Sequence, residues 1–65
     1  MTTGQKVKAA RKEWKWSQMR LAKEVGISRA ALSRIENGSE PNMSIATATK
    51  IAKTLGLSLD YLLCS

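Results

Sequence analysis

The segment from residue 25 to residue 38, VGISRAALSRIENG, predicts a short helix with an unusual exposed face. Helical spacing directs Leu32 and Ile35 to one side, together with Ser28. The opposite side carries small or polar side chains, which are Ala30, Ser33, Arg34 and Asn37, with Arg29 at its edge. A guanidinium group presents five N–H donors and a permanent positive charge. The chemistry that this face offers is therefore hydrogen-bond donation to an acceptor-rich partner.

The net charge of the chain is concentrated in its first half. Eleven basic and five acidic residues give a formal net charge of +6. Residues 1–36 hold nine basic and three acidic side chains, whereas residues 37–65 hold two of each. This asymmetry suggests a polyanionic partner, either nucleic acid or an anionic membrane surface. A solvated basic face that only maintains solubility is equally compatible with the charge alone.

Length and composition exclude several classes of protein. The 65 residues allow one domain, residues 1–65, and a core of this size supplies only about 3 to 5 kcal/mol of net stability. With one cysteine and no histidine, we expect no disulfide, metal site or cofactor. We expect no enzyme, because the chain offers no nucleophile paired with a base. The charged N-terminal region contains no signal peptide and no uncharged run could span a membrane, so the expected location is the cytoplasm.

Four serines mark predicted helix starts. An apolar residue, a serine, three residues and then a leucine occur in the segments WSQMRL, ISRAAL and LSLDYL, and MS before Ala48 is a weaker version. Serine favours the N-cap position, and the flanking apolar pair can form a hydrophobic staple. Helices should therefore begin near residues 17, 28, 44 and 58, with an earlier helix over about residues 4–15. Gly26, Gly38 and Gly56 are placed where a chain leaves a helix. We predict an all-α fold, a compact bundle of five short helices.

The connection between the second and third helices is short. Val25 ends one helix, Gly26 can turn the chain and Ser28 caps the next helix, so about three residues join them. Two helices joined so tightly must cross at a steep angle. Ala22 is small where this crossing is tightest.

An arginine interrupts the apolar stripe of the first helix. The stripe comprises Val7, Ala10, Arg11 and Trp14. A guanidinium group on a core face needs a carboxylate, and Glu36 lies beside the inner face of the third helix. We therefore predict an Arg11–Glu36 ion pair. The alternative is that Arg11 extends along the edge of the stripe to solvent.

The segments WSQMRLAKEVGISRAALSRIENG and IAKTLGLSLDYLL resemble the phage repressor and Cro class of helix-turn-helix DNA-binding domains, found in bacterial and phage transcriptional regulators. The resemblance covers roughly residues 5 to 63. The positions that carry it are Arg11, Gln18, Leu21, Ala22, Gly26, Ser28, Leu32, Glu36, Asn37, Gly38, Ile51, Ala52, Leu55, Gly56 and Leu62. The loop ENGSEPNMSIA departs from the family pattern by running about one residue longer. Because the chain ends just after the fifth predicted helix, we expect no separate sensor or dimerisation domain.

The resemblance implies a lambda-repressor-like DNA-binding domain. Residues 17–25 would form the positioning helix and residues 28–36, beginning at Ser28, the recognition helix in the major groove. Arg34 and Ser33 would then read base edges, and Ala30 could contact a thymine methyl group. Arg29 could reach either a base or a phosphate.

The resemblance also implies contacts with the DNA backbone. Gln18 matches a family glutamine that contacts the sugar-phosphate backbone, and Asn37 with the backbone after Gly38 would form a second anchor. Lys6, Arg20 and Lys23 are candidates for general electrostatic attraction, although Arg20 could equally be only solvated. Such contacts set register and strength but not sequence preference.

The aromatic residues have a simpler interpretation. Trp14 and Trp16 match apolar positions of the helical pattern, so we expect core and staple roles for them in preference to base stacking. Tyr61 and Leu63 could form a self-association patch. Members of the family commonly dimerise through their C-terminal helices and bind pseudo-palindromic operators with half-sites about 34 Å apart.

Together, the residues and the resemblance predict a transcriptional regulator that binds double-stranded DNA sequence-specifically. It would act as a dimeric repressor in the cytoplasm of a bacterium or a phage-infected host. The alternative is an antitoxin or another protein-interaction module with the same fold. A membrane-surface peptide would need a sustained apolar face on a free helix. RNA binding would need exposed stacking aromatics, which the polar face of residues 28–38 lacks.

Overall fold

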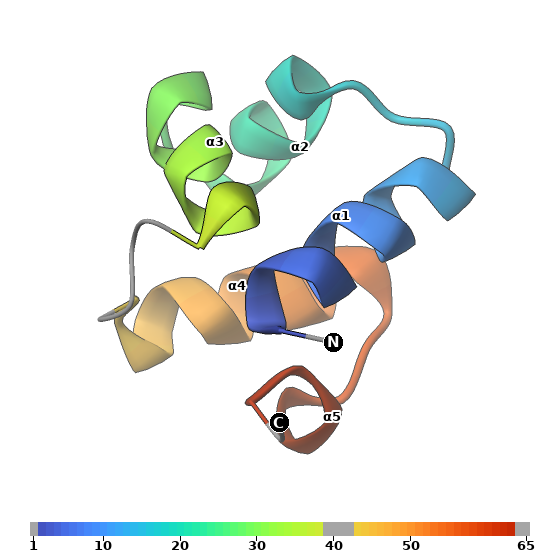
Figure 1. Cartoon of the computed structure of the whole chain (residues 1–65), viewed down its shortest axis with the longest axis vertical. Helices are drawn as coiled ribbons and strands as arrows, with labels where there is room; N and C mark the ends of the chain where they lie inside the picture. The colour runs from blue at the N-terminus through green and yellow to red at the C-terminus, as the bar shows by residue number, and fades with distance from the viewer. Residues whose placement is uncertain (1, 39–42, 64–65) are drawn as a thin grey trace.

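The computed structural model describes residues 2–38 and 43–63. Within these ranges the chain forms α1 (Thr3–Glu13), α2 (Gln18–Val25), α3 (Arg29–Asn37), α4 (Ile45–Leu55) and α5 (Leu59–Leu63) and no strand (Figure 1). The predicted all-α bundle of five short helices is confirmed. The long loop expected after Gly38, its backbone phosphate contacts and Cys64 lie outside the described residues.

Serine caps start the helices where the sequence pattern places them. The hydroxyl groups of Ser17, Ser28, Ser44 and Ser58 each accept a hydrogen bond from the backbone N–H three residues later, at 3.0 to 3.2 Å. These bonds satisfy N–H groups that the helix itself leaves unpaired. A capping box that the serine pattern does not predict starts α1, where Thr2 and Gln5 exchange hydrogen bonds.

The first helix ends earlier than predicted. It was expected to extend to about residue 15, but it ends at Glu13 and Trp14 caps it. Lys15 then adopts a left-handed conformation with φ of 60°. Its N–H donates to the carbonyl oxygen of Lys12 at 2.9 Å, and the N–H of Trp16 donates to that of Arg11 at 3.2 Å. This pattern is a Schellman motif, and its sequence signal is weak because lysine stands where glycine is usual.

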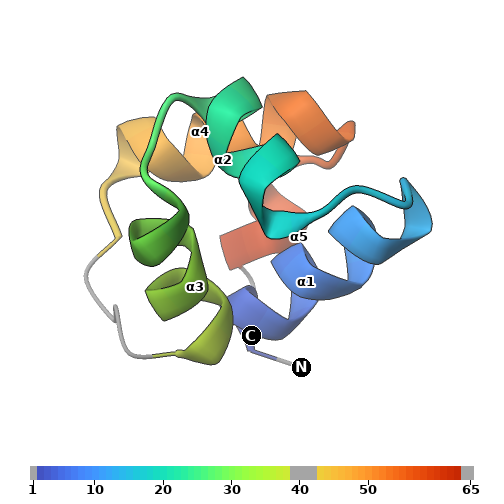
Figure 2. The ribbon, with the colours of Figure 1, turned by 90° about the horizontal axis from the view of Figure 1, so that it is seen from above.

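The turn between α2 and α3 has the predicted form. Gly26 has φ of 87°, in the left-handed region that glycine adopts without strain. The N–H groups of Gly26 and Ile27 donate to the carbonyl oxygen of Ala22 at 2.8 and 3.0 Å. Because Ser28 caps the next helix, three residues separate α2 from α3, and the two helices pack against each other (Figure 2).

Each helix contributes a large, fully buried side chain to a common core. These side chains are Val7, Leu21, Leu32, Ile51 and Leu62. The four residues that precede the serine caps, Trp16, Ile27, Met43 and Leu57, pack against this core as staples. Helix α1 packs on α3, α4 and α5, and α2 packs on α3 and α4.

The prediction that Trp14 belongs to the buried stripe is wrong. Its side chain is 52% exposed, although its indole N–H donates to the carbonyl oxygen of Leu55 at 3.2 Å. Trp14 follows the last residue of α1, where the helical periodicity that predicted burial no longer applies. No helix among the described residues is long and apolar enough to cross a membrane.

Candidate nucleic-acid interface

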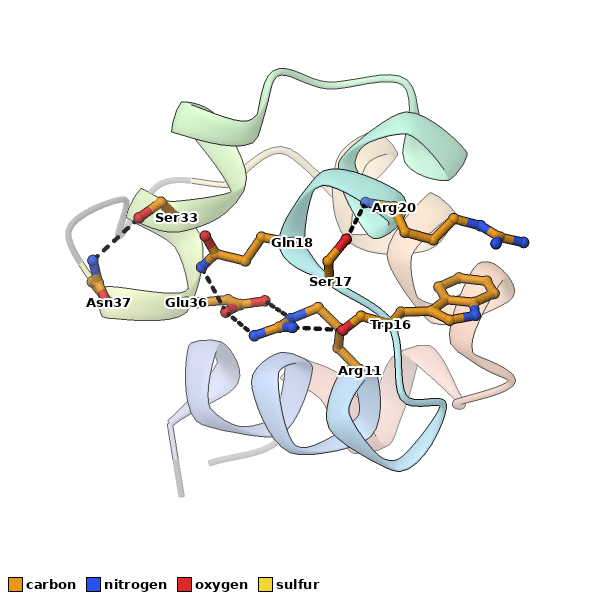
Figure 3. Close-up of polar contacts among 8 residues, drawn as sticks. All are labelled: Arg11, Trp16, Ser17, Gln18, Arg20, Ser33, Glu36 and Asn37. Carbon is orange, nitrogen blue, oxygen red and sulfur yellow. Dashed lines mark hydrogen bonds and ion pairs between the residues drawn. The ribbon is translucent and has the colours of Figure 1, made fainter.

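The outer face of α3 carries the side chains expected from its sequence. Arg29, Ala30, Arg34 and Asn37 are exposed and Ser33 is half-buried, whereas Leu32, Ile35 and Glu36 are buried. The amide nitrogen of Asn37 lies 3.5 Å from the hydroxyl oxygen of Ser33, one helical turn away (Figure 3). We call the surface formed by Arg29, Ala30, Ser33, Arg34 and Asn37 the α3 face. It combines two guanidinium groups with small neighbours that allow close approach.

Beneath this helix, a buried ion pair joins α1 to α3. The Nε of Arg11 lies 2.8 Å from Oε2 of Glu36, and Nη2 donates to Oε1 at 3.2 Å. The two residues are 8% and 5% exposed, so the predicted pair is confirmed and the solvent-directed alternative for Arg11 is excluded. Nη1 of Arg11 also donates to the carbonyl oxygen of Trp16 at 2.7 Å. Buried ions need this degree of hydrogen bonding to offset their desolvation.

Gln18 joins the same network from the start of α2. Its Nε2 donates to Oε1 of Glu36 at 3.0 Å, so one carboxylate oxygen accepts from both Gln18 and Arg11 (Figure 3). The family resemblance implies only a DNA-backbone contact for Gln18 and does not predict this hydrogen bond. No local pattern could reveal it, because the two residues are 18 positions apart and belong to different helices.

A close approach of backbones holds α1 against the C-terminal turn of α3. A Cβ atom placed on Gly4 would overlap the carbonyl oxygen of Ile35 and lie 2.8 Å from that of Glu36. Gly4 therefore lets α1 come within backbone contact of α3, close to the residue that supplies the buried carboxylate. The sequence contained a usable signal, because a glycine inside a helix usually has a packing reason.

Two of the residues expected to supply general electrostatic attraction have partners within the chain. Arg20 forms an exposed ion pair with Glu24 at 3.1 Å, and its guanidinium carbon lies 4.6 Å from the centroid of the Trp16 ring. In Figure 3 its side chain points away from Gln18 and α3. Lys6 donates to the carbonyl oxygen of Tyr61 at 2.8 Å and lies 4.8 Å from its ring centroid. Lys23 is exposed on α2.

The tryptophans have structural contacts. The ring centroids of Trp14 and Trp16 are 5.5 Å apart and the rings are inclined by 44°. Trp16 packs on the core as the predicted staple of α2. Both residues come from the connection between α1 and α2, and neither belongs to the α3 face.

A three-residue connection between two packed helices, with the second helix exposing a polar face, is typical of a helix-turn-helix domain. A family model described as helix-turn-helix matches residues 7–62, and the chain belongs to this family. The predicted resemblance is thereby confirmed.

Similar sequences and a similar solved structure support this assignment. The chain is 40% identical over 60 residues to the immunity repressor protein of Bacillus phage phi105, covering 92% of this chain and 41% of the repressor. It is 40% identical over 53 residues to the antitoxin HipB of Escherichia coli O6:H1, covering 82% of this chain and 55% of the antitoxin. The chain thus spans about half of the length of these relatives. The crystal structure of the P22 c2 repressor in complex with a synthetic operator superposes with a TM-score of 0.90 at 36% identity, covering 98% of this chain and 96% of the repressor chain.

Proposed function

We propose that this chain is a sequence-specific, double-stranded DNA-binding transcriptional regulator that acts as a repressor. The observation that carries the proposal is the α3 face, which the Gly26 turn and the Arg11–Glu36 pair hold at a defined position beside the start of α2. Helix α2 would position the domain on the DNA backbone, and α3 would enter the major groove. The similarity to a repressor whose structure was determined with an operator supports this role.

The α3 face contains the base-reading residues of the proposal. Arg34 is exposed near the centre of the face, and a guanidinium can donate two hydrogen bonds to O6 and N7 of guanine. Ser33 would donate to or accept from a neighbouring base edge. Ala30 is small enough to contact a thymine methyl group. Arg29, in the first turn of α3, would contact a base or a phosphate.

Three further residues would contact the sugar-phosphate backbone. Gln18 lies in the first turn of α2, and Ser28 caps α3. Unpaired N–H groups and the helix dipole favour phosphate at both positions. Asn37 ends α3 and would form the other anchor. These contacts would set the register on the duplex without selecting its sequence.

We further propose that the protein acts as a dimer in the cytoplasm. Residues 1–65 would act as a single DNA-binding domain that dimerises through its C-terminal helices on a pseudo-palindromic operator. The family comprises DNA-binding regulators, so we propose no enzymatic activity and no metal or cofactor. Its operator would be bacterial or phage DNA, which locates the protein in the cytoplasm of a bacterium or an infected host.

Selection of binding sites from a random duplex library tests the proposal. Purified protein at near-physiological salt should enrich an inverted repeat, preferred over a scrambled duplex by about a thousandfold or more. Titration of both duplexes at several salt concentrations separates sequence reading from charge attraction. Equal binding of all duplexes, weakened alike by salt, would exclude sequence-specific regulation.

Arg34→Ala should relax the base preference at one position in each half-site. If Arg34 donates to a guanine, the substitution costs about 1 to 3 kcal/mol of binding free energy at that position. Repeating the selection with the variant measures this change. Lys53→Ala, which removes an exposed cation from α4, is the control and should leave the selected sequence unaltered.

A protein-interaction role is the second candidate, and the similarity to antitoxin HipB favours it. In that case a protein partner would bind this domain and DNA binding would be secondary. The Arg34→Ala variant distinguishes the two functions. It should keep a partner complex intact while losing base preference if DNA reading is primary.

A further inference from the structure

The Arg11–Glu36 pair contacts the start of α2 at two points. Nη1 of Arg11 donates to the carbonyl oxygen of Trp16, the residue before the helix cap. Oε1 of Glu36 accepts from Nε2 of Gln18, the first residue of α2. The pair therefore holds both the backbone that enters α2 and the first side chain of that helix.

The charge of Glu36 determines how the amide of Gln18 is oriented. An ionised carboxylate can only accept hydrogen bonds, so the amide must turn its nitrogen toward Glu36 and its oxygen away. The 3.0 Å contact of Nε2 with Oε1, drawn in Figure 3, has this orientation. The amide nitrogen carries two hydrogens, and the contact uses one of them. The other N–H remains available to an acceptor outside the protein.

Fixing this side chain has a consequence for binding. Glutamine loses much rotamer freedom when it is immobilised, and that entropy opposes any contact that must first order it. Gln18 is half-buried and already tied to Glu36. A ligand that accepts a hydrogen bond from the other N–H of Gln18 therefore binds with a smaller entropy cost, because the donor is already ordered.

We infer that Arg11 and Glu36 are positioning residues that hold Gln18 for its contact with the DNA backbone. This inference rests on the proposed function, because it assumes that a phosphate is the acceptor. It assigns to the buried pair a role in DNA affinity that is separate from its role in stability. Both side chains are buried, so the role inferred for them acts through Gln18.

Two matched double variants separate the roles. Arg11→Met with Glu36→Leu removes both charges and the acceptor for Gln18. Arg11→Met with Glu36→Gln removes both charges but keeps a carbonyl oxygen that can accept from Gln18. Replacing both members avoids leaving one buried charge unpaired. Ile51→Val, a conservative change at a fully buried position on α4, is the control for a general loss of stability.

The affinity of each folded variant is measured on the inverted repeat selected with the wild-type chain, with and without Gln18→Ala. Gln18→Ala should weaken binding by about ten- to hundredfold, the range expected for one hydrogen bond to a charged phosphate, and Arg11→Met/Glu36→Leu should weaken it by up to the same factor. Gln18→Ala should cost less affinity in the leucine double variant than in the wild type, because a Gln18 side chain that is no longer held contributes less to binding. Arg11→Met/Glu36→Gln should bind more tightly than its leucine counterpart and stay sensitive to Gln18→Ala.

Placing a neutral methylphosphonate at each backbone position in turn identifies the phosphate involved. One position should weaken wild-type binding but not binding by Gln18→Ala or by Arg11→Met/Glu36→Leu. If Gln18→Ala weakens the leucine double variant as much as the wild type, the inference is wrong. It is also wrong if affinity follows stability across all variants, including Ile51→Val.

A measurement without DNA keeps this inference distinct from the proposed function. The side-chain amide protons of Gln18 should exchange slowly with solvent in the wild type and faster in Arg11→Met/Glu36→Leu, as followed by NMR. Unchanged exchange would overturn the positioning role even if DNA binding is established. If exchange accelerates as expected but the wild-type chain selects no duplex, the proposed function has failed, and the DNA role inferred for the pair fails with it.

Discussion

At the level of single residues, Lys15 adopts a left-handed backbone conformation that residues with a Cβ atom disfavour. The chain needs a left-handed residue to close the Schellman motif at the end of α1, and lysine occupies that position with φ of 60°. For a residue with a Cβ atom, this conformation costs about 1 to 2 kcal/mol. The motif persists because Trp16, the next residue, packs on the core.

Lys15→Gly should therefore stabilise the protein by about 1 kcal/mol, because glycine adopts the conformation without strain. Lys15→Ala is the control, since it removes the same exposed side chain but keeps the Cβ atom. Urea unfolding followed by tryptophan fluorescence measures both free energies of unfolding. A glycine variant no more stable than the alanine variant would contradict the strain argument.

At the scale of elements, the contact of α1 with α3 decides where the α3 face lies. Gly4 allows the two backbones to touch, and the Arg11–Glu36 pair joins the same helices further along α1. Both interactions act near the C-terminal turn of α3, which ends at Asn37 and is capped by the left-handed Gly38. The orientation of the α3 face therefore depends on α1, although α1 contributes no residue to it.

Gly4→Ala should destabilise the protein by at least about 1 to 3 kcal/mol, because the added methyl group overlaps backbone atoms that cannot move without shifting α3. Helix propensity alone predicts the opposite sign, a gain of up to about 1 kcal/mol. Thermal unfolding measures the sign directly. Ala9→Gly, at an exposed position of the same helix, reports the propensity effect without the contact.

The losses of unfolding free energy caused by Arg11→Met and Glu36→Gln should be strongly non-additive. The double variant should lose much less than the sum of the two single variants. Removing one member leaves a buried charge unpaired and costs about 3 to 5 kcal/mol, on the order of the total stability of so small a domain. Unfolding measured in a stabilising osmolyte keeps the variants folded enough for comparison. Losses that simply add would contradict the interaction.

At the level of the whole protein, exposed apolar residues offer a contact surface for the proposed dimer. Tyr61 and Leu63 on α5 are 49% and 43% exposed, and Lys6 from α1 covers one side of the Tyr61 ring. Exposed apolar side chains on a small domain indicate an interaction surface. The proposed dimer would bury them while leaving both α3 faces available to the operator.

Leu63→Glu should weaken cooperative binding to the selected inverted repeat and leave binding to an isolated half-site unchanged, because a charge at the proposed contact opposes dimerisation. Ile45→Glu is the matched control, since Ile45 is 62% exposed but lies in the first turn of α4. Gel-shift titrations on both duplexes measure the effect. Equal effects of the two substitutions would argue against dimerisation through α5.

Local sequence patterns were sufficient to predict the helices and the outer face of α3. Serine caps, apolar staples and the Gly26 turn act over a few residues, so their spacing was sufficient to place four of the five helix starts. The Arg11–Glu36 pair was also predictable, although it joins distant segments. A charge on a core face requires a partner, and the chain has only five acidic residues from which to choose.

The tertiary structure decided the features that depend on distances between helices. Trp14 is exposed because α1 ends before it, and Arg20 lies against Trp16 and Glu24. Gly4 is needed because the backbone of α3 packs directly against it. Gln18 donates to Glu36 because the start of α2 lies beside the end of α3. The spacing of residues within one helix carries no information about such contacts between helices. They follow from how five amphipathic helices pack together around one core.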